Sequence, residues 1–169
     1  GSISEFCLSS MIRSIILDKQ NSEMLPVTEA LLYAASRAQH VGEVILPALK
    51  KGCVVISDRF TDSSIAYQGF GRNLGDIVST VNAPAVQGLK PDVTFLLRTD
   101  PAKMRNRRDA AKEDRMDAQK LEFHETVLRG YLALSEKEPE RIRVIDGERT
   151  IEQIAEEIRY CVENLLKDR

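Results

Sequence analysis

Three short apolar runs, separated by long amphipathic segments, set the tightest limit on the fold of this chain. The runs lie at residues 54–57, 93–97 and 142–145 and consist mainly of valine, isoleucine, leucine and phenylalanine. Apolar runs of this length, rich in β-branched residues, are typical of strands buried on both faces of a parallel sheet. The sequence therefore predicts three parallel strands.

Helical periodicity fills the intervals between these runs. From Thr28 to Lys50 apolar residues recur every three or four positions, with Thr28 as the expected N-cap and Gly52 as the expected stop. Further helices are predicted over residues 12–17, 76–87, 117–135 and 151–166, the last one opened by a capping box of Thr150 and Gln153. Strands that alternate with helices indicate an α/β fold with right-handed crossovers.

Composition limits the classes of function. The 169 residues, of which 43% are hydrophobic and 30% charged, fit one globular domain over residues 1–169. Because 24 basic and 26 acidic residues give a net charge of −2, we expect no nucleic-acid partner and no membrane partner. No apolar run approaches the roughly 18 residues of a membrane span, and the three cysteines form no CxxC pair. We therefore expect a cytoplasmic protein without a disulfide framework.

The segment after the first predicted strand carries the densest group of polar side chains, and ligands of parallel sheets bind beyond the carboxyl ends of strands. These residues are Asp58, Arg59, Ser63, Ser64, Tyr67 and Gln68. If residues 61–68 are helical, the last four form two pairs, each four residues apart and on one side. Asp58 could hold Mg²⁺ or cap the next helix, and Arg59 could bind a phosphate or pair with a nearby carboxylate.

Two other groups of residues are candidates for binding. Tyr33 and Arg37 lie four residues apart on the longest predicted helix, where an aromatic plane and a guanidinium could together contact a nucleobase. Alternatively, the stem of Arg37 covers the helix surface and its charge stays in water. An arginine-rich stretch over about 102–118 is either a solvated charged helix or a lid whose arginines close over a polyphosphate.

Four segments carry a resemblance to a known family: TEALLYAASRAQHVGEVILPALKKG, VVISDRFTDSSIAYQGFGRNLG, LKPDVTFLLRTDP and EFHETVLRGYLAL. In this order they closely resemble bacterial thymidylate kinases, which pass the γ-phosphate of ATP to dTMP and so make dTDP. The resemblance runs from about residue 12 to residue 166, and SDRFTDSSIAYQG is its most specific piece. It implies a P-loop-kinase-like parallel sheet flanked by helices, a homodimer formed through long helices, and the use of Mg²⁺ with ATP.

The resemblance also implies roles for individual residues. Tyr33 would stack against thymine, while Arg37 would contact the base and approach the phosphate. Ser64 and Gln68 would contact the polar edge of thymine, with Ser63 in the same substrate-binding group. Tyr67 would lie beside the sugar.

The remaining implied roles concern the phosphates. Arg59 would hold the dTMP phosphate, and Asp58 would assist Mg²⁺ and the placement of substrate. Arginines of the lid, which match Arg107, Arg108 and Arg115 in kind, would serve the phosphoryl groups of ATP.

Two features depart from the family pattern. The family opens with a strand and a GxxxxGK[ST] loop that cradles the ATP phosphates, and no such loop occurs in the 169 residues. We therefore expect a sheet that lacks its first strands, separation of the runs at 54–57 and 93–97, and a chain that binds dTMP but is inactive or nearly so. Arg98 also stands where the family usually has an acidic residue at a strand end.

Two alternatives to a thymidylate kinase remain. The chain could be a noncatalytic nucleotide-binding or oligomerisation fragment, or a kinase for another nucleoside monophosphate.

Overall fold

The computed structural model describes residues 7–107 and 113–167, except for the side chains of residues 105–107. Its α-helices are α1 (Leu8–Leu17), α2 (Pro26–His40), α3 (Leu46–Lys50), α4 (Thr61–Ser64), α5 (Ile77–Val86), α6 (Pro101–Arg107), α7 (Leu121–Lys137) and α8 (Ile151–Lys167). Two π-helical segments, η1 (Val41–Ile45) and η2 (Ile65–Gly71), continue α2 and α4. The strands are β1 (Thr94–Arg98) and β2 (Ile142–Asp146).

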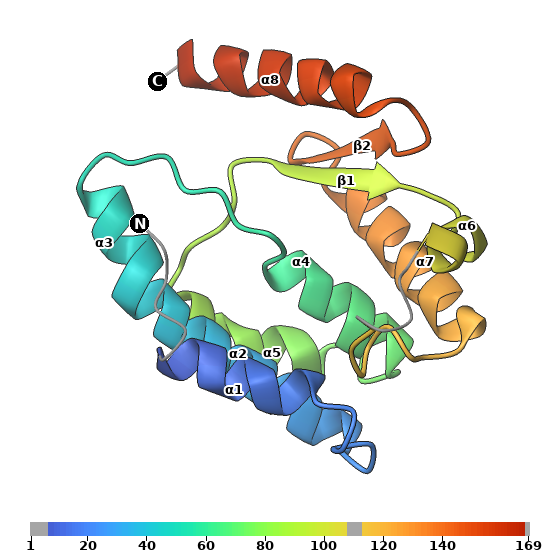
Figure 1. The fold of residues 1–169 in the computed structure, drawn as a ribbon. Coiled ribbons are helices and arrows are strands. Elements are labelled where there is room, and N and C mark those ends of the chain that lie inside the picture. Colours follow the sequence, from blue (N-terminus) through green and yellow to red (C-terminus); the bar gives the residue numbers. More distant parts are fainter. Residues whose placement is uncertain (1–6, 108–112, 168–169) are drawn as a thin grey trace.

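The two strands form a parallel sheet between layers of helices. Figure 1 shows α8 on one side of the sheet and α7 on the other, with α1, α2 and α5 grouped further away on the side of α7. Thr94 pairs with Ile142 at one end of the sheet, and Arg98 pairs with Asp146 at the other. This arrangement confirms the α/β fold with a parallel sheet, and it confirms the second and third predicted strands to within one residue at each end.

The first apolar run does not form a strand, so that part of the prediction is wrong. Residues 53–57 carry no regular secondary structure. Val54 and Ile56 are 62% and 94% exposed, although their sequence is that of a buried strand. A strand requires a neighbour to exchange backbone hydrogen bonds, and no strand of the described residues pairs with this run. The separation of this run from the strand at 94–98 agrees with expectation.

The helix predicted from Thr28 to Lys50 begins earlier than its sequence indicates. α2 starts at Pro26 with Leu25 as its N-cap residue, so Thr28 lies inside the first turn and is not the cap. Proline is favoured in the first turn because its missing N–H would have no helical partner there. Helical structure then runs through η1 and α3 to Lys50, and Gly52 ends it with a φ of 75°, as predicted.

The last two helices differ in how well the sequence predicts their starts. α7 begins at Leu121 and not at Asp117, because residues 114–117 form a turn in which the Asp114 carboxylate accepts the N–H groups of Met116 and Asp117, both at 2.8 Å. α8 begins as predicted: the Thr150 N–H donates to Gln153 Oε1 at 3.2 Å, and the Gln153 N–H donates to Thr150 Oγ1 at 3.3 Å.

Helices α1, α2 and α5 form a second layer, which lies apart from the sheet. Small side chains allow these helices to pack closely. Ala30 and Ala34 of α2 are buried, as are Val78 and Ala85 of the neighbouring helix α5. Ile16 is fully buried on α1, which packs against α2. A separate small core of Leu96, Leu134 and Ile142 joins the sheet to α7. Within the described residues, no helix is both long enough and apolar enough to cross a membrane.

A largely buried ion pair fixes α4 to the start of both strands. Arg141 donates from Nη1 to Asp62 Oδ2 at 2.8 Å and from Nη2 to Asp62 Oδ1 at 2.7 Å. Thr94 Oγ1, at the start of β1, donates to the same carboxylate at 2.9 Å. Because the two side chains are only 11% and 8% exposed, removing either partner would leave a buried charge unpaired.

We predict that Arg141→Met lowers the free energy of unfolding by about 3 kcal/mol, the range in which a buried ion pair is broken from one side. Urea unfolding followed by circular dichroism measures this change. The control is Arg143→Met on β2, because Arg143 pairs only loosely with Glu140 at 3.8 Å and both are largely exposed. That change should cost less than about 0.5 kcal/mol. Equal effects of the two substitutions would contradict the assignment.

Candidate functional site

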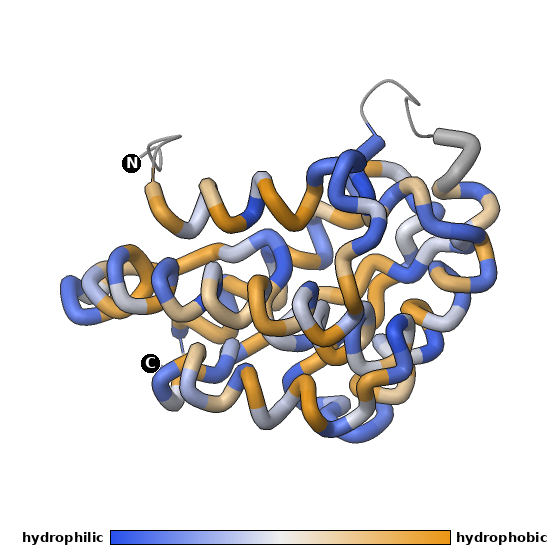
Figure 2. The backbone as a smooth tube through the Cα atoms, turned by 90° about the horizontal axis from the view of Figure 1, so that it is seen from below, coloured by the Kyte–Doolittle hydropathy of each residue, from blue (hydrophilic) through white to orange (hydrophobic). Residues whose placement is uncertain are grey.

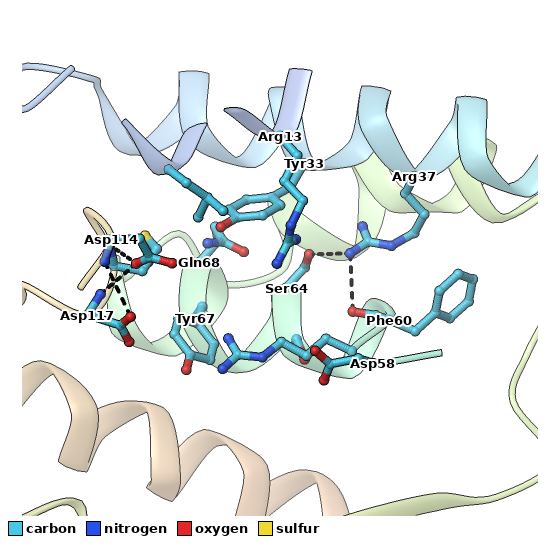
Figure 3. A pocket seen from close by; sticks show the side chains of 14 residues that line it. Arg13, Tyr33, Arg37, Asp58, Phe60, Ser64, Tyr67, Gln68, Asp114 and Asp117 are labelled. Carbon is cyan, nitrogen blue, oxygen red and sulfur yellow. Dashed lines mark hydrogen bonds between the residues drawn. The ribbon is translucent and has the colours of Figure 1, made fainter. Parts of the chain in front are cut away.

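A pocket opens between the helices of the second layer and the polar segment that follows residue 57 (Figure 3). Figure 3 shows Arg13, Tyr33 and Arg37 reaching in from α1 and α2, with Ser64, Tyr67 and Gln68 facing them from α4 and η2. The lining also includes Asp58, Arg59, Phe60 and Ser63, and, from the turn before α7, Asp114, Met116 and Asp117. The structure therefore brings together Tyr33, Arg37 and all six polar residues predicted after the first run.

The π-helical segment η2, whose turns are wider than those of an α-helix, forms part of the pocket wall. Residues 61–71 are helical, so Ser63 and Tyr67 form one pair of lining residues and Ser64 and Gln68 form another, as the spacing predicts. π-helical turns are rare and occur most often at functional sites. Ser64 and Gln68 are only 3% and 2% exposed, so their polar groups act in a site largely shielded from water.

Arg37 is held by three acceptors. Its Nη2 donates to the Phe60 carbonyl oxygen at 3.1 Å and to Ser64 Oγ at 2.9 Å, and its Nη1 donates to Asn82 Oδ1. Burial lowers the pKa of Arg37 to about 10, so the guanidinium keeps its charge at neutral pH. These contacts exclude the interpretation in which the Arg37 charge stays in water.

Arg59 has a strained backbone at the edge of the same pocket. Its φ is 68°, in the left-handed region that residues other than glycine rarely adopt. Its guanidinium lies over the Tyr67 ring, 5.0 Å from the centroid. Strain of this kind persists only where surrounding contacts enforce it, and it concentrates at binding and catalytic sites.

Two partly buried tyrosines stay protonated and neutral near the charged groups of this wall. Burial raises the pKa of Tyr33 to about 12, and burial likewise raises the pKa of Tyr131 to about 12. Tyr131 donates its hydroxyl to Ser63 Oγ at 2.6 Å, and its ring contacts Tyr67 edge to face. Tyr131 therefore supports two lining residues from α7, a role that local sequence patterns do not predict.

Glu29 is fully buried behind the pocket and accepts four hydrogen bonds. Gln68 Nε2 and Arg72 Nε donate to Glu29 Oε1 at 2.9 and 3.3 Å. Arg72 Nη2 and Arg115 Nη2 donate to Glu29 Oε2 at 3.1 and 2.5 Å. Burial raises the pKa of Glu29, but the hydrogen bonds from Arg72, Gln68 and Arg115 outweigh it and hold the pKa below its ordinary value. Glu29 is therefore ionised at neutral pH.

The three predicted lid arginines have different positions. Arg115 is 6% exposed, and besides its bond to Glu29 it donates from Nε to the Ile16 carbonyl oxygen at 2.7 Å. In this structure it thus links the turn before α7 to α1 and does not line the pocket. Arg107 ends α6, and its side chain is outside the described part of the structure. Arg108 lies outside the described residues.

Sequence patterns did not identify three charged residues that line the pocket, Arg13, Asp114 and Asp117, or the buried Glu29 behind it. Arg13 is the lone charged residue in the apolar helix α1, a signal that could have identified it. Glu29 precedes Tyr33 and Arg37 at the same spacing of four, so it shares their face of the helix. Asp114 and Asp117 line the pocket from a turn in the stretch expected to be a lid, where the arginines alone were considered.

Three carboxylates line the pocket, those of Asp58, Asp114 and Asp117, and Asp58 is the one expected from the sequence to assist Mg²⁺. Asp58 lines the pocket next to Arg59. Within the described residues, no group of three or more histidine, cysteine, aspartate or glutamate side chains could hold a metal ion. A metal at Asp58 would therefore take most of its ligands from water or substrate, as Mg²⁺ commonly does at sites that bind phosphates.

Comparisons with known proteins give one consistent result. The family model for thymidylate kinase matches residues 7–158. A thymidylate kinase of Lactobacillus delbrueckii subsp. bulgaricus is 50% identical over 151 residues, which cover 87% of this chain and 71% of the relative. Those of Pelobacter propionicus and Bacillus licheniformis are 46% and 41% identical, over 89% and 95% of this chain and 73% and 78% of the relatives. The chain belongs to the thymidylate kinase family.

Proposed function

We propose that this chain binds dTMP in the pocket between α2 and η2 and serves transfer of the γ-phosphate of ATP to it, giving dTDP. The observation that carries the proposal is the convergence of Tyr33, Arg37, Ser64 and Gln68 on one pocket in a chain of the thymidylate kinase family. An aromatic ring, a guanidinium, a hydroxyl and an amide together can stack on a pyrimidine and hydrogen-bond to its polar edge.

The aromatic and neutral polar groups of the pocket suit the base of a nucleotide, and its guanidinium groups suit the phosphate. Tyr33 stacks against the base, and Ser64 and Gln68 contact its edge. Arg59 binds the phosphate, since a guanidinium matches phosphate oxygens with two parallel hydrogen bonds. Tyr67, which lies under the Arg59 guanidinium, borders the sugar between these ends.

In phosphoryl transfer the main tasks of the protein are to position the two substrates and to stabilise negative charge. Arg37 and Arg59 supply fixed positive charge on the dTMP side of the reaction. Asp58 would hold Mg²⁺, which neutralises charge on the transferring phosphoryl group when bound with ATP. Arg107 and Arg108 are the lid arginines proposed to serve the ATP phosphates. Arg115 could join them only by leaving Glu29.

Exposed apolar side chains on α1 and α2 support the proposal that the chain forms a homodimer, and we propose the cytoplasm as its location. Those that are 44–55% exposed are Leu8, Met11, Ile15, Val27 and Leu31. Seen from the side of these helices in Figure 2, hydrophobic residues recur along α1 at the surface. Because α1 and α2 pack against each other, exposed apolar residues on both are typical of a face covered by another chain.

We predict that the double variant Met11→Glu and Leu31→Glu is monomeric while the unchanged chain is a dimer, because two carboxylates would be buried in the interface. Light scattering after size-exclusion chromatography measures the mass. Glu substitution of Ile151, an 81% exposed residue at the start of α8, is the control and should leave the mass unchanged. A monomeric unchanged chain would refute the dimer.

Binding of dTMP is tested by isothermal titration calorimetry. We predict that Arg59→Ala weakens dTMP binding about 10- to 100-fold, the effect of losing a charge-assisted hydrogen bond to phosphate. Arg143→Ala on β2, outside the pocket, should leave the affinity unchanged. Competition by AMP and CMP should be weak. If AMP or CMP binds more tightly than dTMP, the chain acts on another nucleoside monophosphate; if no nucleotide binds, the binding proposal is wrong.

Turnover by the 169 residues is a separate question, because they contain no GxxxxGK[ST] loop to hold the ATP phosphates. We predict that these residues by themselves release ADP from ATP and dTMP far more slowly than the roughly 1 to 100 s⁻¹ of ordinary kinases. A coupled ADP assay on the polypeptide measures this rate. Turnover within the ordinary range would show that the loop is dispensable here.

A further inference from the structure

Glu29 is a buried charge that contacts the pocket wall without lining the pocket. It is 0% exposed and lies on α2, one turn before Tyr33. Its partner Gln68 does line the pocket, although it is only 2% exposed. The hydrogen bond between them, from Gln68 Nε2 to Glu29 Oε1 at 2.9 Å, fixes how the Gln68 side chain is turned.

The chemistry of the two groups permits one orientation. An ionised carboxylate only accepts hydrogen bonds, whereas an amide has a donating nitrogen and an accepting oxygen. Turning the Gln68 amide over would bring its oxygen against a buried negative oxygen. Gln68 must therefore direct its NH₂ group to Glu29. The carbonyl oxygen Oε1 is the group left for a ligand, and among residues 7–107 and 113–167 no hydrogen bond engages it.

Two arginines keep Glu29 itself in place. Arg72 contacts both carboxylate oxygens, and Arg115 contacts Oε2. Each oxygen thus accepts two hydrogen bonds, and the carboxylate cannot rotate without breaking them. The orientation of Gln68 is set by a fixed partner and not by a mobile surface group.

We propose that Glu29 is a positioning residue that sets the base selectivity of the pocket, by making Gln68 present a hydrogen-bond acceptor to the base. This inference rests on the proposed dTMP-binding function. Thymine and uracil carry a donor at N3, which matches the Gln68 oxygen. Cytosine carries an acceptor at N3, which would face that oxygen and be repelled.

The variant Glu29→Gln inverts this pattern. The glutamine at position 29 has a single oxygen. That oxygen should face the Nη2 groups of Arg72 and Arg115, which contact Oε2 of Glu29 in the unchanged chain. Its NH₂ group then takes the place of Oε1 and requires Gln68 to turn its own oxygen inward. Gln68 would now present NH₂ to the pocket, which suits the cytosine acceptor.

Two companion variants separate selectivity from stability. Arg72→Gln alone removes one ion pair but leaves the bond between Glu29 and Gln68, so it should keep the wild-type selectivity. The double variant Glu29→Gln with Arg72→Gln removes one negative and one positive charge, so the net charge of the buried cluster is unchanged. It also removes the Arg72 Nε donor that would face the new NH₂ group, and it serves if Glu29→Gln alone does not fold.

The experiment measures dissociation constants for dTMP, dUMP and dCMP by calorimetry on the full chain and the three variants, each checked for folding by circular dichroism. The wild type should prefer dTMP to dCMP. This preference should fall about 10- to 100-fold in both variants that lack Glu29, the effect of a mismatched buried hydrogen bond. The ratio of dTMP to dUMP should not change, because both bases carry the N3 donor.

Other results have distinct meanings. If a merely structural role applied, all three nucleotides would weaken together and their ratios would stay constant; that result overturns the proposal. Equal loss of selectivity in Arg72→Gln, or a wild type that does not distinguish dTMP from dCMP, also overturns it. If the wild type binds no dTMP, the proposed function itself fails.

Discussion

The buried carboxylate of Glu29 is the interaction on which the shape of the pocket depends. It joins α2, η2 and the turn before α7 through Gln68, Arg72 and Arg115. Half of the residues that line the pocket project from these three segments. Leaving the buried Glu29 carboxylate without its partners would cost free energy. Separating any of these segments from the others is therefore unfavourable. The pocket is therefore held open by electrostatics and hydrogen bonding, while the apolar cores lie beside it.

A second buried ion pair relates the pocket to the sheet. Asp62 and Arg141 connect α4 to the starts of both strands, and Ser63 and Ser64 directly follow Asp62 on the pocket wall. Contacts at two points thus hold the polar segment in position against the pocket: Asp62 binds Arg141 in the first turn, and Gln68 binds Glu29 near the end. This double attachment explains how the segment is ordered although residues 53–57 before it join no strand.

Local patterns in the sequence predict most of the helices, two of the three expected strands and much of the pocket. Spacings of four residues place Tyr33 with Arg37 and Ser64 with Gln68, because helix geometry alone decides which side chains share a face. The first apolar run is different, since a strand exists only with a neighbour and that neighbour is not encoded locally. Glu29 shares a helix face with Tyr33 and Arg37, but its role depends on arginine partners 43 and 86 residues away, which no local pattern predicts.

A crystal structure of the chain with dTMP tests the central claim, that a fixed buried carboxylate shapes a pocket for a pyrimidine nucleotide. The account predicts the base in hydrogen-bonding distance of Gln68 and beside Tyr33, with both Glu29 oxygens still bound by Arg72 and Arg115. A nucleotide bound elsewhere, or a Glu29 side chain released from both arginines when dTMP binds, would contradict it.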